Sequence, residues 1–218
     1  LRIILSSKEI AKSCIMLQLG KRNLEYNDFT SAGVNLYYSL FHACLSVLAL
    51  TSRELDVKKC VSEFEYRSRL APYYIPMSHK DVANRIREFD AKLSDKLNEL
   101  KEIREYLSYG PNVFLRAKLK NEVLIFTCKI PRIFEKIERY SKVLDGNILQ
   151  AMRTIKSIVG KGNLDFILIY FGLTTKILCR HLSLGKKIER GILNRFIRDL
   201  GMRNLVLEVE PRIRLKAK

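Results

Sequence analysis

A short stretch near the carboxyl end of the chain carries side chains suited to contacting a nucleic-acid duplex. It runs from Gly172 to Leu184, and helical spacing places Leu178 and Leu182 on its inner side. The outer side then presents hydroxyl, thiol, amine and guanidinium groups, which can contact phosphates and base edges. The candidate DNA-binding residues on this side are Thr174, Thr175, Lys176, Cys179, Arg180 and Ser183.

This stretch resembles the turn and recognition helix of a helix-turn-helix motif. Gly172 can adopt the left-handed conformation of such a turn, and Thr174 suits the position that caps the following helix. Leu168 departs from the motif, because a small residue usually stands where the two helices cross. The resemblance implies a short helix over 164–171, a turn at Gly172, and a recognition helix over 174–184 that enters the major groove of DNA.

The end of the chain resembles the wing of a winged helix-turn-helix domain. Residues 205–215 alternate in part between apolar and charged side chains, and Pro211 separates two short predicted strands. The resemblance implies that Arg212 and Arg214 touch backbone phosphates. In an alternative register, residues 186–200 form the recognition helix. Its candidate DNA-binding residues are Lys187, Arg190, Asn194 and Arg198.

A second candidate site lies where Arg104 is followed five residues later by Tyr109. Residues 32–43 (AGVNLYYSLFHA) and 104–110 (REYLSYG) resemble parts of HEPN domains, small helical bundles common in prokaryotic toxin and defence proteins. HEPN ribonucleases place a His about five residues after the Arg and pair two such sites across a dimer. Tyr109 stands at that position, so we expect no imidazole there to take a ribose 2′-hydroxyl proton.

These residues also have a structural interpretation. Arg104 and Tyr109 are interpreted first as a brace at the end of a helix, with a catalytic role as the alternative. His42, inside an apolar run, is predicted to be a hydrogen-bonded core histidine, and His181 a packing residue or a phosphate contact. No second ligand is spaced to make a metal site, and no cofactor is predicted.

The amino-terminal half predicts a bundle built around one central helix. Residues 29–50 are apolar nearly all round, which favours the buried centre of a helical domain over a membrane span. Asp28 or Thr30 is predicted to cap this helix. Ser6 and Glu9 predict a capping box that opens an earlier helix, ending at a turn from Gly20 onwards.

Two long helices and a domain boundary are predicted next. Apolar residues recur at steps of three or four from Val82 to Leu107, which predicts a helix from 81 to a stop at 110–111. A further helix over 113–142 is predicted to kink at Pro131. The Asp-Gly-Asn sequence at 145–147 predicts a turn that divides the chain into two domains.

The predicted fold class is mainly α. An antiparallel helical bundle over 1–145, HEPN-like, is followed by a small winged-helix-like domain over 146–218 with a short C-terminal β-hairpin. Within the second part, helices are predicted over 148–159, 164–171, 174–184 and 186–200, with breaks at 160–162 and Gly201. A short helix over 57–67 is also predicted.

Charge and cysteine content limit the choice of partners. The net charge is +17, and residues 146–218 carry 15 Lys and Arg against 5 Asp and Glu, which favours a polyanionic partner. The five cysteines form no C-x-x-C pair, so reduced thiols in a cytoplasmic protein are predicted, with no zinc site or disulfide framework. No signal peptide and no membrane association are expected.

These observations lead to three hypotheses. The first is a non-catalytic protein that binds double-stranded DNA, in regulation or defence, with the bundle joining two copies or binding a ligand or partner protein. The second is a HEPN-type protein that binds RNA or cleaves it without a metal. The third is a structural subunit of a larger complex.

Overall fold

The structure is a computed structural model. It describes the backbone of residues 1–53, 77–116 and 120–201, and the side chains of these residues outside 110–130. Helices form nearly all of this part of the chain, which confirms the mainly α class. In chain order they are α1 (Arg2–Glu25), α2 (Phe29–Thr51), α4 (His79–Arg87), α5 (Ala91–Arg116), α6 (Lys120–Val159), the 3₁₀ turn η1 (Lys161–Asn163), α7 (Leu164–His181) and α8 (Lys186–Asp199).

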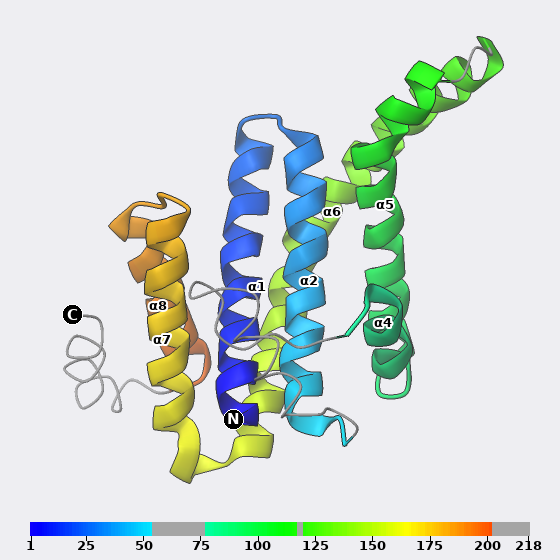
Figure 1. The fold of residues 1–218 in the computed structure, drawn as a ribbon. Coiled ribbons are helices and arrows are strands. Elements are labelled where there is room, and N and C mark those ends of the chain that lie inside the picture. The colour runs from blue at the N-terminus through cyan, green and yellow to red at the C-terminus, as the bar shows by residue number, and fades with distance from the viewer. Residues whose placement is uncertain (54–76, 117–119, 202–218) are drawn as a thin grey trace.

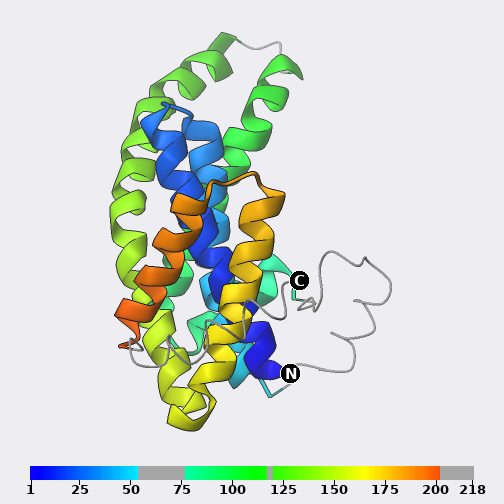
Figure 2. The same cartoon turned by 90° about the vertical axis from the view of Figure 1, so that its left-hand side faces the viewer.

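The antiparallel pair α1 and α2 forms the middle of the molecule. Helices α4 and α5 lie on one flank of this pair and α7 and α8 on the other, and the long α6 runs behind it (Figure 1). Turned by 90°, the molecule shows α7 and α8 in front of α1 (Figure 2). One hydrophobic core joins residues from both flanks, because α1 packs on α7 while α2 packs on α5 and α6.

The prediction for α2 is confirmed. Asp28 accepts a hydrogen bond from the backbone N–H of Ser31 at 3.0 Å and so caps the helix. The polar residues inside the apolar run find partners within the bundle. Ser39 donates a hydrogen bond to the carbonyl oxygen of Ser13 on α1 at 2.9 Å, and Ser46 donates one within α2. Their pairing removes the main cost of burying hydroxyl groups in a central helix.

The predicted start and end of the first helix are wrong. Helix α1 begins at Arg2, so Ser6 and Glu9 lie buried inside it rather than at a cap. Gly20 also lies inside α1, at the point where α2 crosses α1 closely. A Cβ on Gly20 would lie 2.8 Å from a methyl carbon of Leu36. Close helix packing, not a turn, therefore explains this glycine.

The predicted helix over 81–110 is two helices. Helix α4 ends at Arg87, and Asp90 caps α5 by accepting the N–H of Leu93 at 3.0 Å. The predicted stop at Gly110-Pro111 is wrong, because α5 continues to Arg116. A proline removes only one backbone donor, so a helix can continue past it.

The predicted turn at residues 145–147 is also wrong. These residues lie inside α6, which runs without a break from Lys120 to Val159 and contains Pro131. Asp145 accepts contacts from Lys21 on α1 and Arg195 on α8, so its side chain serves tertiary structure rather than a turn. The predicted break after residue 159 is confirmed at Gly160, whose φ of +72° suits a glycine.

The predicted short helix, turn and second helix over 164–184 are a single helix, α7. Gly172 lies buried in its middle. A glycine inside a helix costs about 1 kcal/mol relative to alanine, whereas burying Phe171 beside it contributes roughly 2 kcal/mol or more. Burial on α1 and α8 therefore outweighs the local preference for a turn.

The fold class needs one more correction. The described part of the chain holds no strand, and α7 and α8 contribute to the same hydrophobic core as α1 and α2. The residues assigned to the β-hairpin, 205–215, lie outside the described residues, as does the helix predicted over 57–67.

Among the described residues, two stretches are long and apolar enough to cross a membrane. They are Phe29–Thr51 and Lys161–His181, and 67% and 44% of their most apolar windows are buried in the fold. The core helix of a bundle passes the same test of length and composition. Burial of α2 between α1, α5 and α6 accounts for its apolar surface.

Candidate functional site

The structure separates the candidate DNA-binding residues on α7 into two groups. Lys176 and Arg180 are exposed, as predicted, and Thr174 is half-buried. Thr175 and Cys179 are fully buried, because they lie on the face of α7 that packs into the core. The predicted outer surface is therefore not one continuous recognition face.

The turn between the two carboxyl-terminal helices lies at Ser183 rather than at Gly172. Ser183 has a φ of +52°, and the N–H of Leu184 bonds to the carbonyl oxygen of Cys179 at 2.7 Å. This is the left-handed ending common at helix carboxyl ends, where glycine is usual. Ser183, one of the candidate DNA-binding residues, is therefore an exposed turn residue and not part of a recognition helix.

The candidate residues of the alternative register lie on α8. Helix α8 has nearly its predicted bounds, and Lys187, Arg190, Asn194 and Arg198 are all exposed on it. Its inner face buries Ile192 and Phe196. Arg212 and Arg214 lie outside the described residues.

Arg104 lies at the centre of a group of aromatic and basic side chains. Helix α5 packs on α2 at Gly33, where a Cβ would lie 2.7 Å from a methyl carbon of Leu107. This approach brings the Arg104 guanidinium carbon within 4.9 Å of the Tyr37 ring centre and 5.9 Å of the Tyr38 ring centre. Arg104 also donates to the Tyr38 hydroxyl at 3.3 Å.

The hydrogen bonding of Arg104 is incomplete. Its side chain is 13% exposed, and its second terminal nitrogen lies 3.2 Å from the carboxylate of the neighbouring Glu105. Its Nε is buried and has no acceptor among the described residues. Buried guanidinium donors normally have partners, so this Nε is an unusual feature of the described residues.

His79 stands beside this group. It is the first residue of α4, and a capping box between Ser78 and Asp81 fixes the start of that helix. Its Nδ1 contacts the hydroxyl of Tyr37, and its ring centre lies 4.5 Å from that of Phe41. Partial burial and the positive charge of Arg104 lower the pKa of His79 below its usual 6.5, so the imidazole is neutral near pH 7. Burial also raises the pKa of Tyr37, which keeps its phenol protonated.

His42 joins the same face of α2 to a charged pair on α1. Its Nδ1 lies 2.6 Å from Glu9, and the other oxygen of Glu9 lies 2.6 Å from Lys12. Burial alone would raise the pKa of Glu9, but the attraction of Lys12 and His42 outweighs it and lowers the pKa to about 2. His42 is therefore hydrogen-bonded, as predicted, and lies next to Tyr38 with ring centres 6.2 Å apart. The name "Arg104 cluster" is used below for Tyr37, Tyr38, His42, His79 and Arg104.

Tyr109 stays apart from the Arg104 cluster. Its side chain is 58% exposed. Because Tyr109 follows Arg104 by five residues, the two side chains leave α5 about 140° apart around the helix axis. The expectation that no imidazole lies near Arg104 needs correction. His79, the first residue of α4, lies in the same cluster. The chain has three histidines, and two of them lie in this cluster, a scarcity that could have drawn attention to His79.

Metal and thiol chemistry find little support in the described residues. No group of three or more His, Cys, Asp or Glu side chains there could hold a metal ion. Cys14, Cys44 and Cys179 are free and buried, and burial raises the pKa values of their thiols to about 12, 12 and 11. Cys60 and Cys128 lie outside the described side chains.

Comparisons with protein families, with curated proteins and with solved structures found no match for this chain.

Proposed function

We propose that the chain binds RNA, and that the Arg104 cluster is a contact site for a phosphodiester, as in a HEPN-like protein. The observation that carries the proposal is the partly exposed side chain of Arg104, a cation that lies against two tyrosine rings. A phosphate oxygen would accept a charge-assisted hydrogen bond from the terminal nitrogens of this guanidinium group. DNA binding through an α7 recognition face has less support, because Thr175 and Cys179 are buried and α7 has no hinge.

The test compares RNA with DNA on the full chain. A fluorescently labelled single-stranded RNA and a DNA of the same sequence are titrated in the presence of a chelator, and anisotropy is measured. We expect Arg104→Ala to weaken RNA binding at least tenfold, since it removes a charged hydrogen-bond donor. Arg139→Ala is the matched control, because Arg139 is 63% exposed on α6.

Two results would contradict the RNA proposal. One is equal RNA affinity for Arg104→Ala and the wild type when circular dichroism shows both folded. The other is an isolated chain that binds neither nucleic acid at physiological salt, which would favour the structural-subunit hypothesis.

The position of His79 favours a second function, metal-independent cleavage of the bound RNA. A neutral imidazole beside Arg104 could take the proton of a ribose 2′-hydroxyl. The 2′-oxygen would then attack phosphorus, forming a cyclic phosphate while the bond to the 5′-oxygen breaks. The leaving oxygen would receive a proton from solvent or from a protonated imidazole.

Cleavage has its own test. We expect His79→Ala to abolish cleavage while keeping RNA affinity within about threefold, and Tyr109→Phe to change neither. Because the pKa of His79 is lowered, its imidazole loses its proton at a lower pH than usual. The cleavage rate should therefore rise with pH and level off below pH 6.5. Binding without any cleavage by the wild type would remove this second function and leave the first intact.

A further inference from the structure

We propose that the end of the α7–α8 hairpin and the outer face of α8 form a docking surface for double-stranded DNA. The hairpin surface consists of Lys176, Arg180, Lys186, Lys187 and Arg190. It lies on the opposite flank of the α1–α2 pair from α4 and α5, and so from the Arg104 cluster (Figure 1). It is therefore independent of the RNA proposal.

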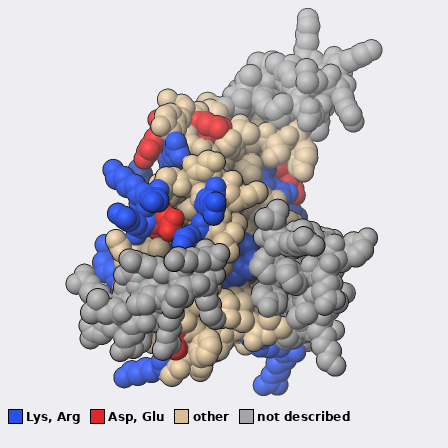
Figure 3. All heavy atoms as spheres, turned by 60° about the vertical axis from the view of Figure 1, so that its left-hand side comes forward, with Lys and Arg blue, Asp and Glu red and all other residues tan. Residues whose placement is uncertain are grey.

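Within the described part of the chain, no acidic side chain neutralises the charges of the hairpin surface. All five cations are exposed, and none has an ion-pair partner among the residues that the structure describes. Other arginines of α8 do have partners. Arg195 pairs with Asp145 and Asp199, and Arg198 pairs with Asp199. Lys and Arg side chains accordingly gather on the face covered by α7 and α8 (Figure 3). A dense set of unpaired cations favours a polyanion.

The backbone adds to this charge. Helix α8 begins after Gly185, which offers no side-chain cap, so the first N–H groups of the helix lack a capping acceptor from that residue. Lys186 and Lys187 stand in the first turn, where the helix dipole already favours an anion. Glu189 also lies in this turn, and the N–H of Ile188 bonds to the carbonyl oxygen of Gly185 at 2.9 Å, so the two lysines supply the main attraction for a phosphate group.

The outer face of α8 distinguishes DNA from RNA. Lys187, Arg190, Asn194 and Arg198 follow one another at steps of three or four and are exposed. An α-helix fits the major groove of B-form DNA, about 12 Å wide, and its Arg and Asn side chains can reach base edges. The deep, narrow major groove of duplex RNA does not admit such a helix. The surface therefore fits duplex DNA better than duplex RNA.

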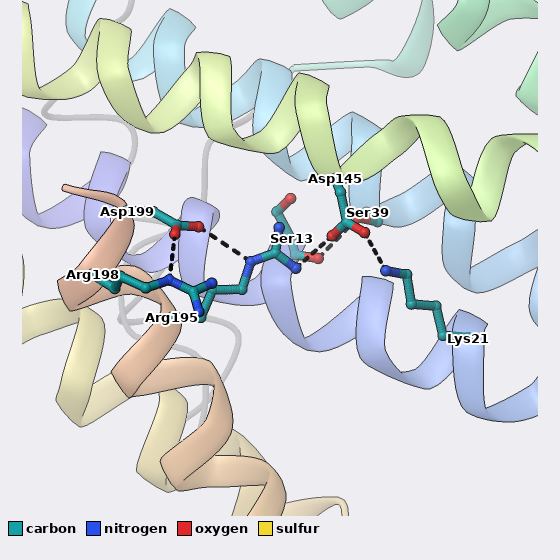
Figure 4. A network of polar contacts seen from close by, with 7 residues as sticks. All are labelled: Ser13, Lys21, Ser39, Asp145, Arg195, Arg198 and Asp199. Carbon is teal, nitrogen blue, oxygen red and sulfur yellow. Dashed lines mark hydrogen bonds and ion pairs between the residues drawn. The ribbon is translucent and has the colours of Figure 1, made fainter.

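The hairpin is already held in place before any DNA arrives. The rings of Phe171 and Phe196 stack with centres 3.6 Å apart and join α7 to α8. Asp145 on α6 accepts contacts from both Arg195 on α8 and Lys21 on α1, and Arg195 also bonds to Asp199 (Figure 4). A surface fixed in this way loses little conformational entropy on binding.

The experiment measures binding of the full chain to a duplex DNA of about 25 base pairs by anisotropy, over a range of salt concentrations. The test variant is Lys186→Ala/Lys187→Ala/Arg190→Ala. The control is Arg87→Ala/Lys92→Ala/Arg132→Ala, which removes the same charge from exposed positions on α4, α5 and α6. We expect the test variant to lose at least tenfold in affinity and to lower the slope of log affinity against log salt by about two to three. The control should lose less than threefold.

Three results would overturn the proposal. They are no binding of duplex DNA at about 100 mM salt, equal losses in the two triple variants, and equal affinity for duplex RNA of the same sequence. Arg104→Ala is measured alongside and should bind DNA like the wild type. A failure at the hairpin surface and a failure at the Arg104 cluster are thus told apart.

Discussion

At the scale of single residues, two charged groups are buried with different numbers of partners. Glu9 is buried in α1 and accepts contacts from Lys12 and His42. Arg104 is nearly buried and lacks one acceptor. The first group is fully paired and supports the fold, whereas the second is the group that we propose as a phosphate contact.

Glu9 should make the free energy of unfolding depend on pH in the acidic range. Its pKa is about 2 in the folded protein against an ordinary 4.5, so its contribution is complete above about pH 4.5 and is lost as pH falls towards 2. We expect the free energy of unfolding, from urea titrations between pH 6 and pH 2, to fall less steeply in Glu9→Gln than in the wild type. Parallel pH curves for the two proteins would contradict this account of the Glu9 pair.

At the scale of elements, two glycines have different effects on the same helix, α6. Gly146 lies on the exposed side of α6, and a Cβ added to it would meet nothing within 4 Å. Gly160 has equal space but a φ of +72°, which disfavours any residue with a side chain. The same residue type therefore weakens a helix in one place and ends it in the other.

Alanine substitutions at these two positions should act in opposite directions. Gly146→Ala should raise the free energy of unfolding by roughly 0.5–1 kcal/mol, because alanine restricts the unfolded chain and suits a helix interior. Gly160→Ala should lower it by roughly 1 kcal/mol or more, because the left-handed conformation is strained for alanine. Thermal unfolding followed by circular dichroism gives both values. A stabilising Gly160→Ala would show that the turn after α6 is not formed in this way.

At the scale of the whole molecule, the hydrophobic core crosses the boundary that the sequence indicated at residues 145–147. Leu144 and Ile148 flank that point on α6 and are both buried. Phe171 and Phe196, from the proposed second domain, belong to the same core as the residues of α1 and α2. The division into two domains stays a prediction, and the continuous core indicates how to test it.

A single cooperative unit should unfold as one. Phe196→Ala should lower the free energy of unfolding by about 3–5 kcal/mol, because it empties a stacked and buried site. We expect native-state hydrogen exchange to show equal loss of protection for the most protected amides of α1 and α7, since both exchange by global unfolding. Loss of protection confined to α7 and α8 would instead support a separate carboxyl-terminal domain.

The sequence by itself determined the features that depend on local pattern. The apolar run of α2 with its Asp28 cap, the bounds of α8 and the break at Gly160 were all predictable, because each follows from side chains close together in the chain. Only the tertiary structure decided that α7 passes through Gly172 and that α6 passes through residues 145–147. It also brought His79 to Arg104 and placed Thr175 and Cys179 in the core. The reason is that a local turn preference is worth about 1 kcal/mol per residue, and packing between distant helices contributes more than that.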